Sequence, residues 1–176
     1  MNAVQSLAGV CVVIPAAGTG SRMLSEIPKQ YMRLSGKPVL QITLEKFLAL
    51  DPDRVVLVVS PDDEHYRGID IVESCEVVVG GAERSESVSN GLGVLDLKPS
   101  DLVLVHDAVR PCVRSVDILR LVESVANHDV GGLLAVSVIE TLKSKSSGVV
   151  ETIDREGFWQ AQTPQVFRYG LLLEAI

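Results

Sequence analysis

Five short runs of aliphatic residues recur along the chain, and most of them are continuous rather than alternating with polar positions. They lie at Val10–Ile14, Arg54–Ser60, Cys75–Val79, Leu102–His106 and Gly132–Val138. Continuous Val, Leu and Ile runs of this length are typical of strands that are covered on both faces. The pattern therefore predicts a buried sheet whose strands are mainly parallel.

Amphipathic helical patterns fall between these runs. In the segment Pro38–Leu50 the apolar positions return near one face, and Pro38 suits a first helical turn. The segment Ser115–Asn127 begins on a serine of the kind that caps helices and is apolar along one side. Strands that alternate with helices predict right-handed crossovers and an α/β three-layer sandwich. Ligands in such folds bind beyond the carboxyl ends of the strands.

The stretch 140–152 breaks this rhythm, because it is polar and rich in Lys, Ser and β-branched residues, with Ser146, Ser147 and Gly148 at its middle. We expect a β-hairpin arm that projects from the body; a surface loop is the alternative. Phe158 and Trp159 follow shortly after. An exposed arm beside large apolar side chains predicts a homodimer contact.

By its length, the whole chain, residues 1–176, is expected to be a single domain. Its last residues, 168–176, begin an apolar helix that has no terminating glycine. We therefore expect the domain to be truncated at its carboxyl end.

Composition narrows the class of protein. The chain is 47% hydrophobic but only 4% aromatic, which fits an aliphatic α/β protein, and its formal net charge is −7. An acidic protein lacks the broad basic field that nonspecific nucleic-acid binding needs, so an anionic ligand must meet a local basic cluster. The candidates for that cluster are Arg22, Lys29, Arg84, Arg110 and Arg155.

Several other classes of protein are disfavoured. The three cysteines have no C-x-x-C spacing, and the three histidines do not cluster with them at zinc-ligand spacing. The start of the chain has neither a basic region nor a long apolar segment, as a signal peptide or membrane span would require. We expect a cytoplasmic protein that does not bind membranes.

A glycine-rich turn, residues 15–23, follows the first aliphatic run directly. Such a turn points backbone N–H groups into one concavity, which suits a phosphate. Arg22 and Lys29 add a guanidinium and an ammonium within seven positions, and both bind phosphate oxygens. The combination predicts a nucleoside triphosphate site at which the chemistry happens at phosphorus.

Two commoner glycine-rich loops do not fit this segment. The dinucleotide fingerprint G-x-G-x-x-G would need glycine where Met23 stands, and no acidic residue ends a second strand at the required distance. No segment matches the Walker A spacing. A plain turn with incidental basic residues remains the alternative.

Six motifs carry a resemblance to a known family. In chain order they are IPAAGTGSRM, PKQY, GGAERSESV, HDAVRP, the TLK that contains Thr141, and DREGFWQAQTPQ. With them, the chain resembles the 2-C-methyl-D-erythritol 4-phosphate cytidylyltransferase family from Val12 to about Phe167. The resemblance implies a Rossmann-like sheet of the nucleotide-diphospho-sugar transferase type. It also implies transfer of the cytidylyl group of CTP to a sugar-alcohol phosphate, with Mg²⁺ on the triphosphate and release of pyrophosphate.

The resemblance assigns roles to the first two motifs. The cations matching Arg22 and Lys29 would stabilise the pentacovalent transition state, as catalytic residues. No general base is needed, because a phosphate monoester is already nucleophilic at neutral pH. The backbone of one loop would wrap the nucleotide and its triphosphate, and the residues of that loop are Ala16, Ala17, Gly18, Thr19 and Gly20.

The third motif, by resemblance, holds the cytosine and ribose through Gly80, Gly81, Arg84 and Ser87, with Ser87 contacting the base. We expect backbone contacts to the nucleotide here. An ordinary capped helix start is the alternative for this segment.

The fourth motif would place Asp107 near the methylerythritol hydroxyls and the phosphates, with Arg110 in the surrounding network. A structural ion pair between Asp107 and Arg110 is the alternative. His106 is expected to be a packed residue at a strand end.

The last two motifs carry the acceptor site by resemblance. Thr141 and Arg155 would hold the methylerythritol phosphate from the neighbouring subunit of a dimer, and Thr163 matches a position near the substrate. The family continues beyond this point with a threonine and a second substrate-positioning lysine. Two other functions therefore stay open: a ribitol-5-phosphate cytidylyltransferase, and a nucleotide-binding or dimerisation module without turnover.

Overall fold

A computed structural model describes residues 5–18, 27–146 and 148–176 of the chain. Its centre is a six-stranded sheet in the order β5-β4-β1-β6-β10-β7. Strands β5, β4, β1 and β6 are parallel, and β10 runs antiparallel to both of its neighbours. The predicted, mainly parallel sheet is confirmed. The strand bounds are β1 Cys11–Pro15, β4 Arg54–Val59, β5 Glu76–Val79, β6 Leu102–Val105, β7 Gly131–Ser137 and β10 Trp159–Arg168.

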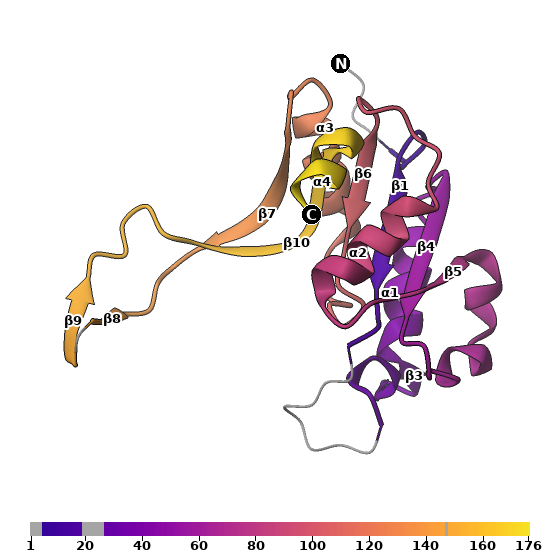
Figure 1. Ribbon diagram of the computed structural model, residues 1–176, viewed down its shortest axis with the longest axis horizontal. Coiled ribbons are helices and arrows are strands. Elements are labelled where there is room, and N and C mark those ends of the chain that lie inside the picture. Colours follow the sequence, from indigo (N-terminus) through magenta and orange to yellow (C-terminus); the bar gives the residue numbers. More distant parts are fainter. Residues whose placement is uncertain (1–4, 19–26, 147) are drawn as a thin grey trace.

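Helices cover both faces of this sheet, which makes the predicted three layers (Figure 1). The α1 helix (Val39–Leu48) and the α3 helix (Ser115–Val125) bury their apolar sides against one face. The α2 helix (Arg84–Gly93) and the α4 helix (Tyr169–Ala175) pack on the other. Both predicted helices are therefore present, each ending two residues earlier than its sequence pattern. The described part of the chain contains no helix that is long and apolar enough to cross a membrane.

Short elements complete the fold at its periphery. Two two-residue strands pair with each other after the η2 turn, and the turns η3 and η4 fill the connection from β4 to β5. Their bounds are η2 Lys29–Tyr31, β2 Arg33–Leu34, β3 Lys37–Pro38, η3 His65–Gly68 and η4 Asp70–Ser74.

Backbone hydrogen bonds continue beyond the strands at their carboxyl ends. Ala16 donates its N–H to the Val58 carbonyl at 2.7 Å, and Gly80 donates to the Val59 carbonyl at 2.8 Å. His106 in turn donates its N–H to the Val13 carbonyl at 3.0 Å. These bonds hold the segments that follow β1, β5 and β6 side by side at one edge of the sheet, where ligands bind in such folds.

The β10 strand is an element that the sequence pattern did not predict. Its first half is exposed, and its register against β7 shifts between Ala161 and Gln165. Its second half lies inside the sheet, where Val166 is completely buried. Polar residues and a proline fill the irregular middle of this strand, so it lacks the continuous aliphatic run by which the other strands were recognised.

The predicted arm is confirmed as a hairpin. The strands β8 (Leu142–Ser146) and β9 (Val149–Ile153) pair antiparallel, and Gly148 has a φ of 86°, which suits glycine in the turn. The outer halves of β7 and β10 carry this hairpin away from the body of the molecule (Figure 1). Ile139 and Trp159 are among the most exposed large apolar side chains of the described residues.

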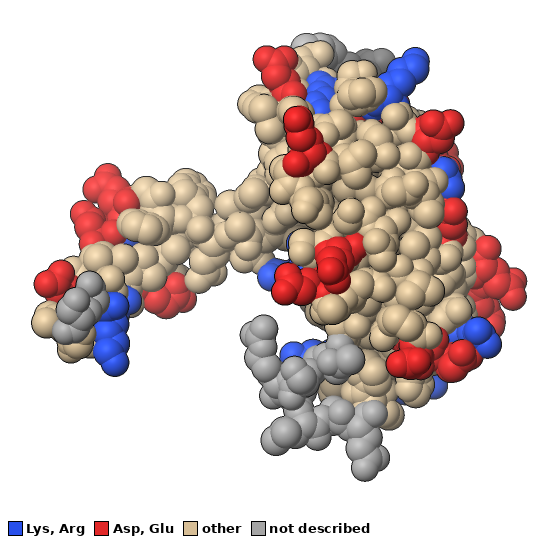
Figure 2. All heavy atoms as spheres, in the orientation of Figure 1, with Lys and Arg blue, Asp and Glu red and all other residues tan. Residues whose placement is uncertain are grey.

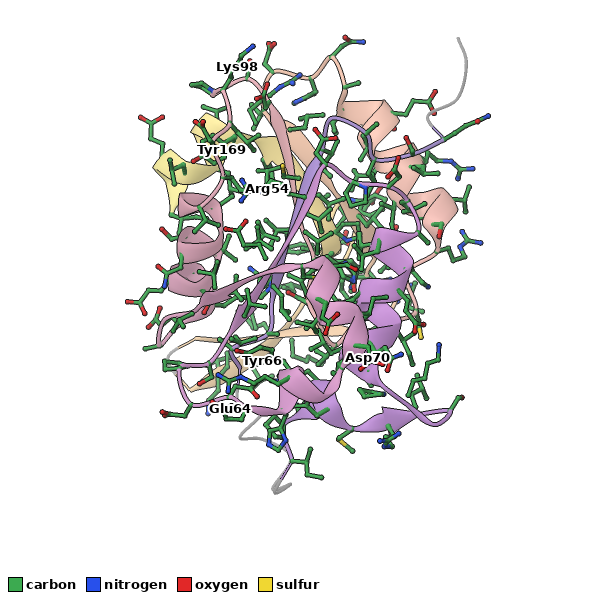
Figure 3. The ribbon with its side chains drawn as sticks, turned by 90° about the vertical axis from the view of Figure 1, so that its right-hand side faces the viewer. Arg54, Glu64, Tyr66, Asp70, Lys98 and Tyr169 are labelled. Atoms are coloured by element: carbon green, nitrogen blue, oxygen red, sulfur yellow. The ribbon has the colours of Figure 1, made fainter. Side chains whose placement is uncertain are left out.

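One tyrosine links the two helices of the second layer by hydrogen bonds. Tyr169, the first residue of α4, donates its hydroxyl toward the carbonyls of Leu92 and Leu95, at 3.3 and 3.1 Å (Figure 3). These carbonyls lie at and just beyond the end of α2, where carbonyl groups have no partner within the helix. The α4 helix therefore supports α2, whose other end forms one wall of the site described below.

The α2 helix lies very close to the sheet at Gly91. A Cβ atom there would lie 2.7 Å from Val13 Cγ1 and 2.8 Å from Val58 Cγ2. We expect Gly91→Ala to lower the free energy of unfolding by about 1–3 kcal/mol, because overpacking a core costs more than the better helix propensity of alanine returns. Denaturant unfolding of the purified protein measures the change.

The matched control is Gly93→Ala in the same helix, where a Cβ atom meets nothing within 4 Å. This substitution should leave the stability unchanged or raise it by up to about 1 kcal/mol. Equal effects of the two substitutions would contradict the close approach of α2 to the sheet.

Candidate functional site

A cavity of about 380 Å³ opens at the carboxyl ends of β1 and β6. Four separate segments line it: the loop after β1, the η2 turn, the start of α2 and the loop after β6. Its described lining residues are Pro15, Ala16, Ala17, Gly18, Lys29, Gln30, Gly81, Ala82, Glu83, Arg84, Ser87, Asp107, Ala108 and Val109. The structure thus brings together residues from four of the six sequence motifs.

The loop after β1 forms the first wall. Three of the residues that were predicted to wrap the nucleotide, Ala16, Ala17 and Gly18, line the cavity. The Gln30 side chain holds this loop, since its Nε2 donates to the Ala16 carbonyl at 2.8 Å in a buried hydrogen bond. The remaining predicted residues of the loop are Thr19, Gly20 and the catalytic candidate Arg22, and they lie outside the described residues.

Lys29 lies in the η2 turn and lines the cavity. Within the described residues, no ion pair engages its ammonium group. An ammonium group without such an ion pair is available to bind an anionic ligand. The catalytic role predicted for Lys29 stays a prediction, which its place at the cavity allows.

The segment before α2 forms the second wall, and its backbone N–H groups are already engaged. Gly81 donates to Ser87 Oγ at 3.2 Å, and Ala82 and Glu83 both donate to Glu86 Oε2, at 2.7 and 3.3 Å. The Gly80 N–H is bound to β4. The capped helix start is therefore present, and a ligand here meets carbonyl oxygens and side chains rather than free backbone donors.

Glycine is required at the turn into α2 for reasons of space. A Cβ atom at Gly80 would lie 2.6 Å from Ser87 Oγ and 2.8 Å from Ala17 Cβ, and one at Gly81 would overlap Glu86. Gly80 therefore allows α2 to begin directly against the loop after β1, and Gly81 leaves space for the Glu86 side chain that closes the turn. Ser87 is buried, and its oxygen accepts from Gly81, so its own O–H remains able to donate into the cavity.

Asp107 joins two arginines beside the cavity. Its Oδ1 accepts from Arg84 Nε and Nη2 at 3.1 and 2.9 Å, and its Oδ2 accepts from Arg110 Nε at 3.1 Å. Arg110 also donates to the Gln162 side chain, and the Asp107 N–H donates to Thr163 Oγ1 at 3.2 Å. The ion pair that the sequence left as an alternative is therefore present. It also holds Arg84 and Arg110 close together, with further N–H groups left for a ligand.

The acceptor residues predicted on the arm lie apart from this cavity. Thr141 immediately precedes β8, and Arg155 follows β9 and donates to the Ile139 carbonyl. Neither lines the cavity of its own chain. Thr163, in contrast, is buried and close to Asp107. The arm thus separates Thr141 and Arg155 from the site that they were predicted to complete.

His106 is packed at the end of β6, as expected. It is completely buried, its ring lies 4.7 Å from the Phe47 ring centroid to centroid, and its Nε2–H donates to the Arg110 carbonyl at 3.0 Å. Its Nδ1 has no hydrogen-bond partner among the described residues. Burial lowers the pKa of His106 to about 4, because it outweighs the opposing effects of the hydrogen bond to the Arg110 carbonyl and of the Asp107 charge, so the ring is neutral at pH 7.

The donor set does not form a metal cage by itself. No group of three or more His, Cys, Asp or Glu side chains lies together in the described part of the chain. Glu83 and Asp107 are the described carboxylates that line the cavity, and both Asp107 oxygens already accept from arginines. The residues fit a divalent cation that arrives on ligand phosphates, which is the usual way in which proteins bind Mg²⁺ with nucleotides.

Sequence reasoning missed the contributions of two side chains. Gln30 fixes the loop after β1, and Glu86 closes the turn into α2. Each lies inside a motif that was recognised. Neither is a cation, however, and the search for residues that bind phosphate considered only glycines and cations. The spacing of Glu83 and Glu86 is one sign that was available, because an acidic residue three positions after a cap closes a helix start.

Charge on the visible face of the molecule is mixed. Figure 2 shows acidic and basic side chains scattered over the body and the arm, without one broad basic surface on this face.

Comparisons with known proteins agree on one family. The model of the family 2-C-methyl-D-erythritol 4-phosphate cytidylyltransferase matches residues 10–176. The relative of that name from Vibrio vulnificus (strain YJ016) is 40% identical over 179 residues, which cover 98% of this chain and 76% of the relative. That from Laribacter hongkongensis (strain HLHK9) is 46% identical over 171 residues, covering 93% of this chain and 74% of the relative.

Solved structures give the same result. The crystal structure of 2-C-methyl-D-erythritol 4-phosphate cytidylyltransferase from Francisella tularensis matches with a TM-score of 0.77 at 39% identity, over 94% of this chain and 75% of that one. A crystal structure of 4-diphosphocytidyl-2C-methyl-D-erythritol synthase matches with a TM-score of 0.81 at 40% identity, over 94% and 78%. These matches confirm the predicted fold class.

The buried neutral His106 predicts a pH dependence of stability. Its pKa is about 4 in the folded protein and near 6.5 in the unfolded chain, so the unfolded state takes up a proton first as the pH falls. The contribution of His106 is therefore complete above pH 6.5 and is lost progressively down to about pH 4, by roughly 1 kcal/mol per pH unit. Urea unfolding at several pH values, for the wild type and His106→Gln, measures this slope.

His106→Gln is expected to be less stable than the wild type at pH 7.5, because its polar side chain is buried in the same apolar contact. Its deficit should shrink between pH 6.5 and pH 4. A deficit that stays constant over this range would contradict a neutral His106 in the folded state.

Proposed function

The chain belongs to the 2-C-methyl-D-erythritol 4-phosphate cytidylyltransferase family, and we propose that it transfers the cytidylyl group of CTP to 2-C-methyl-D-erythritol 4-phosphate in the cavity beyond β1 and β6. The products are 4-diphosphocytidyl-2-C-methyl-D-erythritol and pyrophosphate. The observation that carries this proposal is the meeting of Lys29, the loop after β1 and the start of α2 around one cavity. The named relatives favour this acceptor over ribitol 5-phosphate, and an enzyme over a module without turnover.

The reaction forms one P–O bond and breaks another. A phosphate oxygen of the acceptor attacks the α-phosphorus of CTP, and the bond from that phosphorus to the bridging oxygen of the β-phosphate breaks. The bridging oxygen leaves with its electron pair as part of pyrophosphate. We propose that Arg22 and Lys29 stabilise the negative charge that develops on the phosphoryl oxygens in the transition state. Positioning and cations supply most of the catalysis in phosphoryl transfer.

The nucleotide is proposed to bind between the two walls of the cavity. The loop Ala16–Gly20 faces the triphosphate, and the turn at Gly80 and Gly81 faces the nucleoside. The Ser87 O–H is a donor for the ring acceptors of cytosine, and this is supported by its burial and by its acceptor role toward Gly81. Carbonyl oxygens of the same turn suit the cytosine amino group, because the backbone N–H groups there are engaged.

The acceptor is proposed to lie beside the Asp107 network. Asp107, Arg110 and Thr163 offer a carboxylate, a guanidinium and a hydroxyl within one connected group. Arg84 reaches the same carboxylate from the nucleotide side, so it connects the two halves of the site. Mg²⁺ or another divalent cation is proposed to enter on the triphosphate, where it would offset negative charge that the two reacting anions bring together.

A homodimer is proposed to complete the acceptor site. Thr141 and Arg155 lie on the arm of their own chain and away from its cavity, which is the arrangement expected if they act in the site of a second copy. The exposed Ile139 and Trp159 supply apolar surface for such a contact. A guanidinium suits the attacking phosphate because it can bind two oxygens at once.

The role of Lys29 is tested by Lys29→Ala. Loss of a cation that acts on transition-state charge should lower kcat by about 10²–10³-fold. The assay is pyrophosphate release with CTP and 2-C-methyl-D-erythritol 4-phosphate, with ribitol 5-phosphate as the comparison acceptor. Lys37→Ala is the matched control, because Lys37 is exposed and paired with Glu45 outside the cavity.

Lys37→Ala should keep kcat within about twofold of wild type, as expected for a surface ion pair. A Lys29→Ala enzyme that also stays within a few-fold of wild type would overturn the catalytic role of Lys29. Equal turnover of both acceptors would overturn the proposed acceptor.

Mixing two inactive variants tests whether Arg155 acts in the active site of the other subunit. One subunit carries Lys29→Ala and the other Arg155→Ala, and the two are co-expressed with different tags. In a two-fold symmetric dimer the mixed species has one site with both residues intact, so the mixture should regain about a quarter of wild-type activity. Light scattering on each preparation measures the oligomeric state.

If Arg155 acts within its own chain, each site of the mixed dimer lacks one of the two residues. The mixture then stays as inactive as its parents, and a dimer with no regained activity would contradict the exchange.

A further inference from the structure

A buried hydrogen bond lies behind the turn that carries Lys29. Tyr31 donates its hydroxyl to Asp63 Oδ2 at 2.6 Å, and both side chains are buried. Asp63 lies in the loop after β4, which is 32 positions away in the sequence. Neither residue lines the cavity, and the reaction described above does not use either of them.

Asp63 is itself held in place by its own loop. Its Oδ1 accepts the His65 N–H at 2.9 Å, and its N–H donates to the Ser60 carbonyl at 3.1 Å. The His65 ring lies against the Tyr31 ring, with centroids 5.1 Å apart. Figure 3 shows the neighbouring Glu64 and Tyr66 of this loop at the end of the molecule opposite Lys98. The acceptor of the Tyr31 hydroxyl is therefore part of an ordered turn.

The turn between Pro28 and Met32 is compact, and Lys29 lies two residues from Tyr31. Tyr31 donates its N–H to the Pro28 carbonyl at 2.9 Å, and Met32 donates to the Lys29 carbonyl at 3.2 Å. Gln30 ties the same turn to the loop after β1. The backbone of Lys29 is thus fixed from two sides, by Gln30 toward the cavity and by Tyr31 toward the loop after β4.

We infer that Tyr31 and Asp63 are positioning residues for the proposed reaction, which hold the base of Lys29 so that its ammonium reaches the phosphate that is attacked. This inference rests on the role of Lys29 in the proposed function. A lysine side chain has four rotatable bonds, so its ammonium can be held at a fixed position in the cavity only if its backbone does not move. An error of about 1 Å in such a group can cost up to about 100-fold in rate.

The chemistry of the pair suits a permanent anchor. Burial and the nearby Asp63 carboxylate raise the pKa of Tyr31 well above its usual range, so its hydroxyl keeps its proton and can donate at neutral pH. A hydroxyl that donates to a carboxylate is among the stronger hydrogen bonds in proteins.

The test is a double-mutant cycle between Tyr31→Phe and Lys29→Ala. Tyr31→Phe keeps the ring and removes only the hydroxyl. In the wild-type background we expect kcat to fall about 10-fold, with KM for CTP within about twofold, because the group acts on the transition state. In the Lys29→Ala background the same change should lower kcat by less than about twofold, since the group that it positions is gone.

A role limited to stability would give a different pattern. Tyr31→Phe would then lower the temperature of unfolding but leave kcat unchanged when the assay is run well below that temperature. It would also act equally in both backgrounds. Either result overturns the inference. Tyr66→Phe, in the same loop and outside both the hydrogen bond and the cavity, is the matched control and should keep wild-type kcat.

Asp63 gives a second and independent measurement, for use also if Tyr31→Phe does not fold. Asp63→Ala removes the acceptor and should lower kcat by a factor similar to that of Tyr31→Phe. Asp63→Asn keeps one oxygen that can accept the Tyr31 hydroxyl, but its NH2 group then faces the His65 N–H, so it should recover only part of the kcat lost in Asp63→Ala. An Asp63→Asn enzyme as slow as Asp63→Ala would contradict the anchor.

Failure of this inference can be told apart from failure of the proposed function. If Lys29→Ala alone has little effect, the assigned role of Lys29 is wrong. If Lys29→Ala is severe and the Tyr31→Phe effect is the same in both backgrounds, only the positioning by Tyr31 and Asp63 is wrong.

Discussion

The site depends on how closely α2 lies against the edge of the sheet. Gly80 and Gly91 leave no room for a side chain between this helix and the neighbouring strands and loops. At this distance Ser87 reaches the Gly81 N–H, and Arg84 reaches Asp107 on the loop after β6. Two walls that come from distant parts of the sequence thereby become one cavity. The close contact of helix and sheet thus fixes both the core and the geometry of the site.

The second requirement is to hold cations in an acidic protein. Asp107 accepts from Arg84 and Arg110, so the carboxylate balances two guanidinium groups that would otherwise repel each other. These side chains are partly exposed, and the pairs add little to stability by themselves. Their value lies in geometry, because each arginine keeps N–H groups that are free to bind further oxygens. Lys29 differs, since its side chain has no counterion among the described residues and its position comes from its backbone.

Much of the fold could be predicted from the sequence, because β1, β4, β5, β6 and β7 carry continuous aliphatic runs. The β10 strand could not, because its pairing depends on partners far away in the sequence rather than on its own pattern. At the site, glycines and cations were recognisable, as they are chemically distinctive. Residues that hold other parts of the site in place could not be recognised from the sequence. Gln30, Glu86 and Asp63 look like ordinary polar positions until their contacts are known.

The place of β10 in the sheet also bears on how the chain folds during its synthesis. This strand lies between β6 and β7, although β7 precedes it in the sequence. Until the ribosome has released residues 159–168, β6 has an open edge and β7 has no strand beside it. At ordinary translation speeds this interval lasts several seconds, during which an aliphatic edge is open to wrong partners. Chaperone binding to the nascent protein would therefore matter most just before this strand emerges.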